Sequence, residues 1–341
     1  MNIKKYVIQF FIVLLAFLFV YITLSHRKKG EYIYLTGFCQ GTTYHITYEG
    51  KKGENLQTEI NSILAEFDLT FSTYNRDSVI SKLNRNAPNT KVDENFIKVF
   101  DKSYEVYRKT GGAFDITVGP VINALGFGNT DSQNTDDRFV AGLMKYVGMD
   151  KVRLEKDRLV KADKNVVLDM NGIAQGYSVD LVAGFLEGRG IRNYLVEIGG
   201  ETRCRGKNPN DRIWRIGVDR PVEGNTVPGA DLQVIIELDG KAISTSGNYR
   251  KYYEKDGKKI VHIVDPKTGH PVESNLLSVT IVADDCLTSD AYDTPLMVLG
   301  LDKSIEFLKS NRFLEGYLIY TDGEGRFQAY ATPGFKKLIA E

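Results

Sequence analysis

The chain has 341 residues, of which 42% are hydrophobic and 26% are charged, so it can bury a sizeable core in one large domain or two. Its 44 basic and 44 acidic residues cancel, which argues against nucleic acid as a main partner. Cys39, Cys204 and Cys286 are far apart and form no CxxC pair, so neither a disulfide framework nor a zinc site is indicated.

The N-terminus departs from this ordinary composition. After the start MNIKK, an uncharged run extends from Tyr6 to Ser25, and about 20 apolar residues suffice to cross a hydrocarbon core as a helix. Thr23-x-Ser25 is a poor version of the small-x-small site of a cleavable signal. The run predicts an uncleaved transmembrane anchor in residues 1–30, with a cleaved signal as the alternative, followed by a domain over residues 31–341. Basic residues flank the run on both sides and leave its orientation open.

The remaining chain mixes predicted strands and helices. Aromatic and β-branched residues predict a strand at 41–50, and a polar stretch predicts an exposed loop at 128–137. Apolar residues at helical spacing predict helices at 56–67, 96–107 and 173–185. Further strands are predicted at 166–170, 193–200, 212–218, 232–238 and 276–283, and further helices at 289–299 and 302–310. No regular β-α alternation exists, which favours an α+β fold over a doubly wound sheet.

Common nucleotide fingerprints are absent from the sequence. No GxGxxG follows the first strand, and GxxxxGK[ST] does not occur. The glycines of GGAFDITVGP (111–120) and DMNGIAQGYSVD (169–180) allow close backbone approach to a ligand, and the helix start after Gly172 offers N–H groups of the kind that bind phosphate. Taken alone, each segment is better explained by turn formation and helix capping.

The segment TSDAYDTPL (288–296) contains a possible metal site. Asp290 and Thr294 are four residues apart and share one face of a predicted helix. A carboxylate and a hydroxyl are hard oxygen ligands of the kind that Mg²⁺ takes. In the alternative interpretation, Asp290 only complements the positive end of the helix.

One of the four histidines lies in VHIVDPKTGHP (261–271), before a predicted turn. Histidine exchanges a proton near neutral pH. In an alternating strand, the ring of His262 faces away from Val261 and Ile263, either towards a cleft or simply off the apolar side. A structural histidine is the alternative.

Eight short segments, taken in their order along the chain, match the pattern of a known protein family. The chain resembles the ApbE family, the FAD:protein FMN transferases or flavin transferases, from about Gly41 to past Gly300. The resemblance is carried by GTTYH (41–45), STYNRDSVISKLN (72–84), GGAFDITVGP (111–120), DMNGIAQGYSVD (169–180), LVEIGGE (195–201), STSGNYRKY (244–252), HIVDPKTGHPV (262–272) and SDAYDTPLMVLG (289–300).

The resemblance implies an α+β fold of mixed sheets with packed helices, in a single catalytic domain after the anchor. It implies Mg²⁺-dependent transfer of FMN from FAD to a Thr or Ser hydroxyl of a target flavoprotein, with a phosphoester formed and AMP released. Family targets are typically membrane redox-pump subunits or other extracytoplasmic flavoproteins. The resemblance therefore implies a bacterial cytoplasmic-membrane protein whose catalytic domain lies on the periplasmic or extracytoplasmic side.

The resemblance also assigns roles to residues by position. His262 matches the family's proposed catalytic base, and Ala174, through its main-chain carbonyl, joins Asp290 and Thr294 as a metal ligand. Gln40 stands where the family often has Met, and Gln175 stands where Lys is common, which removes a positive charge near the site. Positions matching contacts to FAD are Gln40, Tyr74, Ala113, Phe114, Asp115, Asn171, Tyr177 and Val264.

Two alternatives remain open at this point. If water replaces the target hydroxyl, the same site hydrolyses FAD to FMN and AMP in a Mg²⁺-dependent reaction. In the second alternative, the chain is a membrane-tethered FAD-binding or flavin-supply protein without turnover. The intact metal ligands and His262 argue against this alternative, because a pure carrier needs no base.

Overall fold

The computed structural model describes residues 30–130, 133–222, 229–249, 252–255 and 257–341. Apart from Gly30, the predicted anchor at residues 1–30 lies outside these ranges. Within them, no helix combines the length and apolar character that crossing a bilayer requires.

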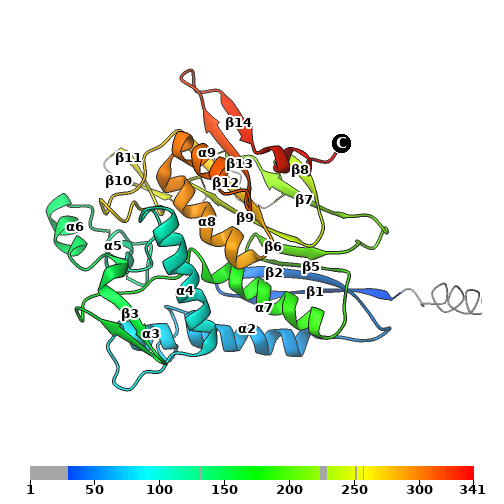
Figure 1. Ribbon diagram of the computed structural model, residues 1–341, viewed down its shortest axis with the longest axis horizontal. Coiled ribbons are helices and arrows are strands. Elements are labelled where there is room, and N and C mark those ends of the chain that lie inside the picture. The colour runs from blue at the N-terminus through cyan, green and yellow to red at the C-terminus, as the bar shows by residue number, and fades with distance from the viewer. Residues whose placement is uncertain (1–29, 131–132, 223–228, 250–251, 256) are drawn as a thin grey trace, which may run out of the picture.

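An eight-stranded sheet in the order β1-β2-β5-β6-β9-β12-β13-β14 forms the centre of the molecule (Figure 1). All neighbouring strands pair antiparallel, rather than in the mixed arrangement that the resemblance implied, and the α+β class is confirmed. The strands are β1 (Glu31–Cys39), β2 (Thr42–Gly50), β5 (Tyr194–Ile198), β6 (Glu201–Arg205), β9 (Lys241–Gly247), β12 (Leu276–Ala283), β13 (Glu315–Thr321) and β14 (Phe327–Ala331).

The longer helices cover one face of this sheet. Helix α7 packs on β5 and β6, α8 packs on β9 and β12, and α2 lies beside α7 (Figure 1). These helices are α2 (Gln57–Phe71), α4 (Glu94–Lys109), α7 (Ala174–Gly188), α8 (Cys286–Leu299) and α9 (Leu301–Ser310). The shorter helices are α3 (Val79–Asn84), α5 (Gly119–Ala124), α6 (Asp137–Met144), the 3₁₀ helix η1 (Met149–Lys151) and α10 (Pro333–Lys336).

Three hairpins complete the described structure: β3 (Val152–Glu155) with β4 (Arg158–Lys161), β7 (Trp214–Asp219) with β8 (Leu232–Leu238), and β10 (Tyr252–Lys255) with β11 (Lys258–Val261). On the opposite face of the sheet, Trp214 and Leu238 of the β7–β8 hairpin form a core with Ile319 and Phe335. The sheet is therefore the middle layer of the fold.

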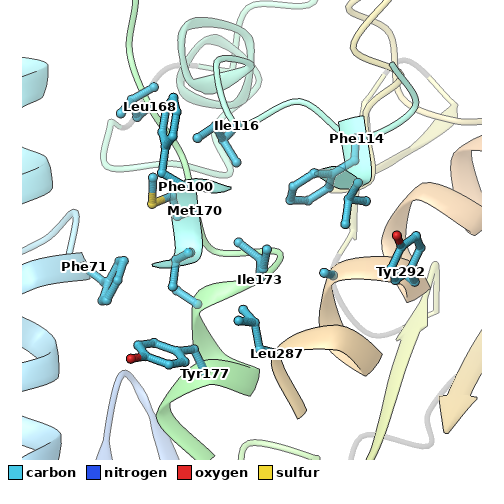
Figure 2. Packing of buried hydrophobic residues seen from close by; sticks show 14 of the residues in the cluster. Phe71, Phe100, Phe114, Ile116, Leu168, Met170, Ile173, Tyr177, Leu287 and Tyr292 are labelled. Atoms are coloured by element: carbon cyan, nitrogen blue, oxygen red, sulfur yellow. The ribbon is translucent and has the colours of Figure 1, made fainter. Parts of the chain in front are cut away.

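The largest core lies among α2, α4, α7, α8 and residues 166–173 (Figure 2). Phe71, Phe96 and Phe100 supply aromatic rings from α2 and α4. Met170 and Ile173 bring the segment before α7 into the same cluster. This packing fixes where α7 begins, which matters because α7 carries several predicted site residues.

The predicted strand at 166–170 is wrong. Only one isolated bridge forms there, between Val118 and Val167. The amide side chain of Asn84 accepts from Leu168 N at 2.7 Å and donates to Leu168 O at 2.8 Å. The Asn84 side chain therefore bonds the N–H and C=O groups of Leu168, which in a sheet would bond a neighbouring strand.

Other predictions agree closely with the structure. The predicted strands at 232–238 and 276–283 coincide with β8 and β12. Helix α8 begins at Cys286, earlier than the predicted 289, because Asp285 caps it by accepting a hydrogen bond from Thr288 N at 2.8 Å. His262 lies just after β11 rather than within it, while Val261 and Ile263 on either side are buried.

Candidate functional site

Helices α7 and α8 approach very closely at Gly176. A Cβ atom at this position would lie 2.3 Å from Cys286 O and 2.6 Å from Asp290 Cβ, so only glycine fits. Gly176 N donates to Asp290 Oδ2 at 2.7 Å. Ile173 at the N-terminus of α7 provides no side-chain cap. The carboxylate of Asp290 in α8 therefore caps a free N–H group in the first turn of α7.

Two buried carboxyl groups lie at this contact. Asp290 is 5% exposed and Asp293 is 2% exposed. Burial raises the pKa of Asp290 to about 7, although the Gly176 N–H acts in the opposite direction. Burial also raises the pKa of Asp293 well above its usual value, and the negative charges of Asp290 and Glu201 add to this effect. The pair resists holding two negative charges without a cation.

Thr294 connects these acids to the sheet. Its Oγ1 donates to Asp293 Oδ1 at 3.2 Å and lies 3.0 Å from Ser246 Oγ of β9. Sequence reasoning missed Asp293 as a candidate, although it follows Asp290 by three residues on the same helix face. Within the described ranges, no group of three His, Cys, Asp or Glu side chains is arranged to hold a metal ion.

The segment between α4 and α5 brings Phe114 to the same place, against Gly172 in the loop before α7. A Cβ atom on Gly172 would lie 3.6 Å from Phe114 Cε2 and 3.8 Å from Thr294 Oγ1. Phe114 is buried, as is Ala113 beside it. The structure thus brings the predicted positions Phe114, Ala174, Asp290 and Thr294 together around the start of α7.

Gln40 contacts α7 at Ser178, four residues after Ala174. It occupies the β1–β2 turn with φ 53°, and its Oε1 accepts from Ser178 Oγ at 3.4 Å. Its Nε2 is buried and has no hydrogen-bond partner. A buried amide donor without a partner is costly, and a ligand that placed an acceptor there would satisfy it. The side chain of Gln175 lies against Gly199 nearby.

The Asp115 carboxylate is engaged within the protein. Its Oδ1 accepts from Thr117 N at 2.8 Å and Thr117 Oγ1 at 2.5 Å, and its Oδ2 accepts from Met149 N at 3.1 Å. Burial raises the pKa of Asp115, while these hydrogen bonds act to lower it. The side chain anchors residues 113–117 to η1, and its contact with FAD stays a prediction.

Three other predicted FAD contacts occupy different surroundings. Tyr177 is buried, and its hydroxyl donates to Asn95 Oδ1 at 2.7 Å. Tyr74 is 70% exposed, and Asn171 is exposed with its N–H bound to Asp169 Oδ1 at 2.8 Å. Tyr74 and Asn171 are accessible to a ligand, whereas the Tyr177 hydroxyl already has a partner in the core.

The His262 segment is held by a closed turn. Asp265 N donates to His270 O at 2.9 Å, and buried Val264 bridges to Pro271. The half-buried ring of His262 lies 6.2 Å from the ring of Phe127, edge to face. Lys267 belongs to the same turn, and its Cε would lie 3.5 Å from a Cβ atom added to Gly112. This contact brings a cation, missed in the sequence, to the residue before Ala113.

A cavity of about 330 Å³ opens between α3, α5 and residues 167–169. Its lining includes Thr73 and Asp169, near Tyr74 and Asn171 in the chain, together with Arg76 and Arg85. This size is within the range of small-molecule sites, and the lining residues include two arginines and one acid, Asp169.

Comparison with known proteins places these features in context. The model of the ApbE family matches residues 40–318. The FAD:protein FMN transferase of Haemophilus influenzae is 38% identical over 92% of this chain and 93% of its own length, and that of Vibrio cholerae is 36% identical over 92% and 95%. Among solved structures, the flavin transferase ApbE from Vibrio cholerae has a TM-score of 0.80 at 34% identity, covering 91% of this chain and 99% of that one. The apo flavinyl transferase ApbE from Pseudomonas stutzeri has a TM-score of 0.80 at 32% identity, covering 92% and 98%.

Proposed function

This chain belongs to the ApbE family, and we propose that it transfers the FMN half of FAD to a Thr or Ser hydroxyl of a target protein. The observation that carries the proposal is the family match over residues 40–318, within which Asp290 and Thr294 meet the start of α7. We assign residues 31–341 to one catalytic domain.

In the proposed reaction, the acceptor oxygen forms a bond to the FMN phosphorus of FAD. The bond from that phosphorus to the bridging oxygen breaks, and AMP leaves with this oxygen. His262 accepts the proton of the acceptor hydroxyl, since a protonated hydroxyl is a weak nucleophile. Phosphoryl transfer depends mainly on positioning and on neutralising charge. The closed turn at 265–270 supplies the positioning of the His262 segment.

The residues at the α7–α8 contact fit a divalent cation. Asp290 and Asp293 are buried acids with raised pKa values, and a cation relieves the repulsion between their ionised forms. Thr294 Oγ1 and the main-chain carbonyl of Ala174 would add hard oxygen donors of the kind Mg²⁺ prefers. Bound there, Mg²⁺ would supply positive charge that offsets the negative charge of the pyrophosphate. Gln40 Nε2 offers a donor to FAD.

The test mixes the purified full chain with FAD, Mg²⁺ and candidate acceptor proteins. We expect flavin fluorescence that stays on the acceptor in a denaturing gel, with AMP released. His262→Ala is expected to lower transfer about 10²–10⁴-fold while FAD binding is kept. Transfer by this variant at the wild-type rate would remove His262 from the mechanism. Release of free FMN without a labelled acceptor would indicate hydrolysis, and FAD binding without AMP release would indicate a carrier.

The proposed partner is a membrane redox-pump subunit or another extracytoplasmic flavoprotein, reached from a membrane anchor in residues 1–30. The uncharged run from Tyr6 to Ser25 supports the anchor. An alkaline phosphatase reporter fused to the C-terminus is expected to be active, because this enzyme folds only outside the reducing cytoplasm. An inactive but expressed fusion would place the domain inside the cell.

A further inference from the structure

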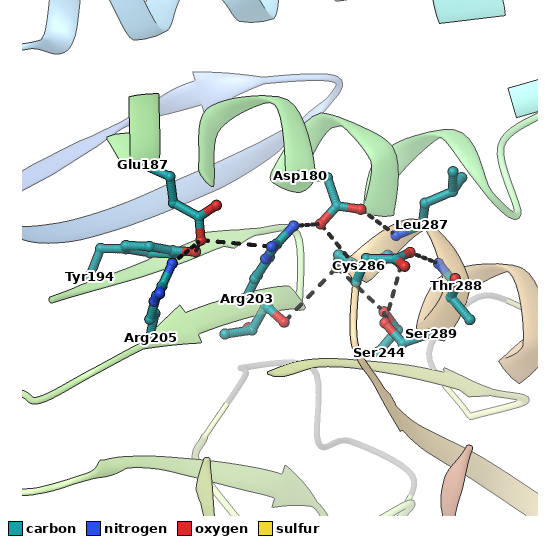
Figure 3. Close-up of polar contacts among 12 residues, drawn as sticks. Asp180, Glu187, Tyr194, Arg203, Arg205, Ser244, Cys286, Leu287, Thr288 and Ser289 are labelled. Atoms are coloured by element: carbon teal, nitrogen blue, oxygen red, sulfur yellow. Dashed lines mark hydrogen bonds and ion pairs between the residues drawn. The ribbon is translucent and has the colours of Figure 1, made fainter. Parts of the chain in front are cut away.

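Asp180 lies one turn beyond Gly176 on α7, and its side chain is directed at the start of α8 (Figure 3). Its Oδ1 accepts from Cys286 N at 3.0 Å, and its Oδ2 accepts from Leu287 N at 2.8 Å. Arg203 Nη1 of β6 donates to Oδ1 at 2.7 Å. The Asp180 side chain is only 9% exposed, so these contacts are shielded from water and geometrically defined.

The two N–H groups that Asp180 accepts are the first two of α8. They have no partner within the helix, and the positive end of the helix dipole favours a carboxylate there. Asp285 caps the third N–H, that of Thr288. The N-terminus of α8 is thus held by two carboxylates, one from Asp285 just before the helix and one from Asp180 of α7.

Asp180 and Gly176 together fix α8 against α7. They are four residues apart and share one face of α7. Gly176 bonds Asp290, and Asp180 bonds the backbone of Cys286. Cys286, Asp290 and Thr294 follow each other at intervals of four along one face of α8. Two attachment points on each helix define both the spacing and the relative rotation of the pair.

We propose that Asp180 is a positioning residue, which sets α8 against α7 so that Asp290 and Thr294 face the carbonyl of Ala174. The inference rests on the proposed function, since the three donors matter only if they hold a cation together. Asn at position 180 keeps one acceptor oxygen but introduces an NH₂ group. That group faces a backbone N–H or the Arg203 guanidinium, and donors cannot bond donors.

Glu187 provides a matched control on the same helix. It accepts from Tyr194 Oη at 2.7 Å and from Arg205 Nη1 at 3.2 Å, and it lies 3.7 Å from Arg203 Nη2 (Figure 3). These partners belong to β5 and β6 rather than to α8. Glu187→Gln therefore removes a carboxylate from the same charge network without touching the start of α8.

The experiment titrates Mg²⁺ into the full-chain wild type, Asp180→Asn and Glu187→Gln, each in the presence of FAD, by calorimetry. Thermal unfolding without metal is measured in parallel. We expect Mg²⁺ affinity about tenfold weaker in Asp180→Asn, the lower end of the loss seen when residues that orient metal ligands are changed. Glu187→Gln is expected to keep wild-type affinity even if its unfolding temperature falls.

Equal Mg²⁺ affinities in the two variants would overturn the inference. If Asp180→Asn does not fold, Asp180→Glu decides, because it keeps the charge but moves both oxygens by one methylene. Weaker Mg²⁺ binding in that variant supports positioning, and unchanged binding overturns it. The proposed function is judged separately, by whether the wild type moves FMN onto an acceptor at all.

Discussion

Two sides of helix α7 differ sharply in how they are packed. Towards α2 and α4, Tyr177 joins an aromatic cluster in which Phe71 stacks on Phe96 with ring centroids 6.3 Å apart. Towards α8, Gly176 and Asp180 make backbone and carboxylate contacts. Apolar burial stabilises a fold, whereas buried acids cost free energy unless they are paired. The aromatic side is therefore expected to govern stability, and the α8 side to govern function.

The largest effect is expected on the aromatic side. Phe96 is fully buried and stacks on both Phe71 and Phe100. Phe96→Ala should lower the free energy of unfolding by about 3–5 kcal/mol, measured by urea denaturation. Transfer per folded molecule should remain at the wild-type level. Phe139→Ala, at a ring that is 45% exposed, is the control and should cost far less. A loss of FMN transfer in the folded Phe96→Ala protein would contradict the proposal that the aromatic side of α7 governs stability alone.

On the α8 side, Gly176→Ala should act mainly on activity. The added methyl group would lie 2.3 Å from Cys286 O and must push the helices apart. A displacement of about 1 Å can lower a rate about 100-fold, and we expect a loss of that size in the gel assay for transfer. Gly184→Ala, in the same helix with open space around it, should be neutral or stabilising. Similar losses in both variants would contradict the argument from close approach.

The acids on the α8 side should also make the metal-free protein sensitive to pH. Burial raises the pKa of Asp290 to about 7 in the folded protein. In the unfolded chain, the pKa of an Asp side chain is about 3.9. Between these values the folded state binds more protons than the unfolded state, so stability falls as pH rises from about 4 to 7. Urea denaturation in EDTA checks this. Asp290→Asn should make the free energy of unfolding less dependent on pH. Parallel plots of this free energy against pH for the two proteins would contradict the raised pKa of Asp290.

A smaller effect is expected for Tyr177→Phe. The hydroxyl of Tyr177 donates to Asn95 Oδ1, and its loss leaves that acceptor unsatisfied. The free energy of unfolding should fall by about 1 kcal/mol in urea denaturation. FAD affinity, measured by fluorescence titration, should not change, because the hydroxyl is already bonded in the core. A weaker affinity would show that the hydroxyl turns to the flavin when FAD binds.

The elements that bury a regular apolar pattern could be predicted from sequence. Strands β8 and β12 match their predicted ranges, since each is a continuous run of mainly aliphatic and β-branched residues that is visible in the sequence. The segment 166–170 could not be assigned correctly, since its backbone partner is the Asn84 side chain, more than eighty residues away. Asp293 could have been found from its spacing to Asp290. The contact of Asp180 with the start of α8 spans over a hundred residues and leaves no local signal.

The strand order also decides when the site can form during synthesis. Helix α7 precedes β5 and β6, whereas α8 follows β12, and β9 lies between β6 and β12 in the sheet that carries both helices. Contacts of such long separation in sequence form late, because the intervening loops must close first. A growing chain that has not yet produced Cys286 lacks every predicted side-chain donor for the cation. Its catalytic capacity is therefore acquired only after α8 has been synthesised.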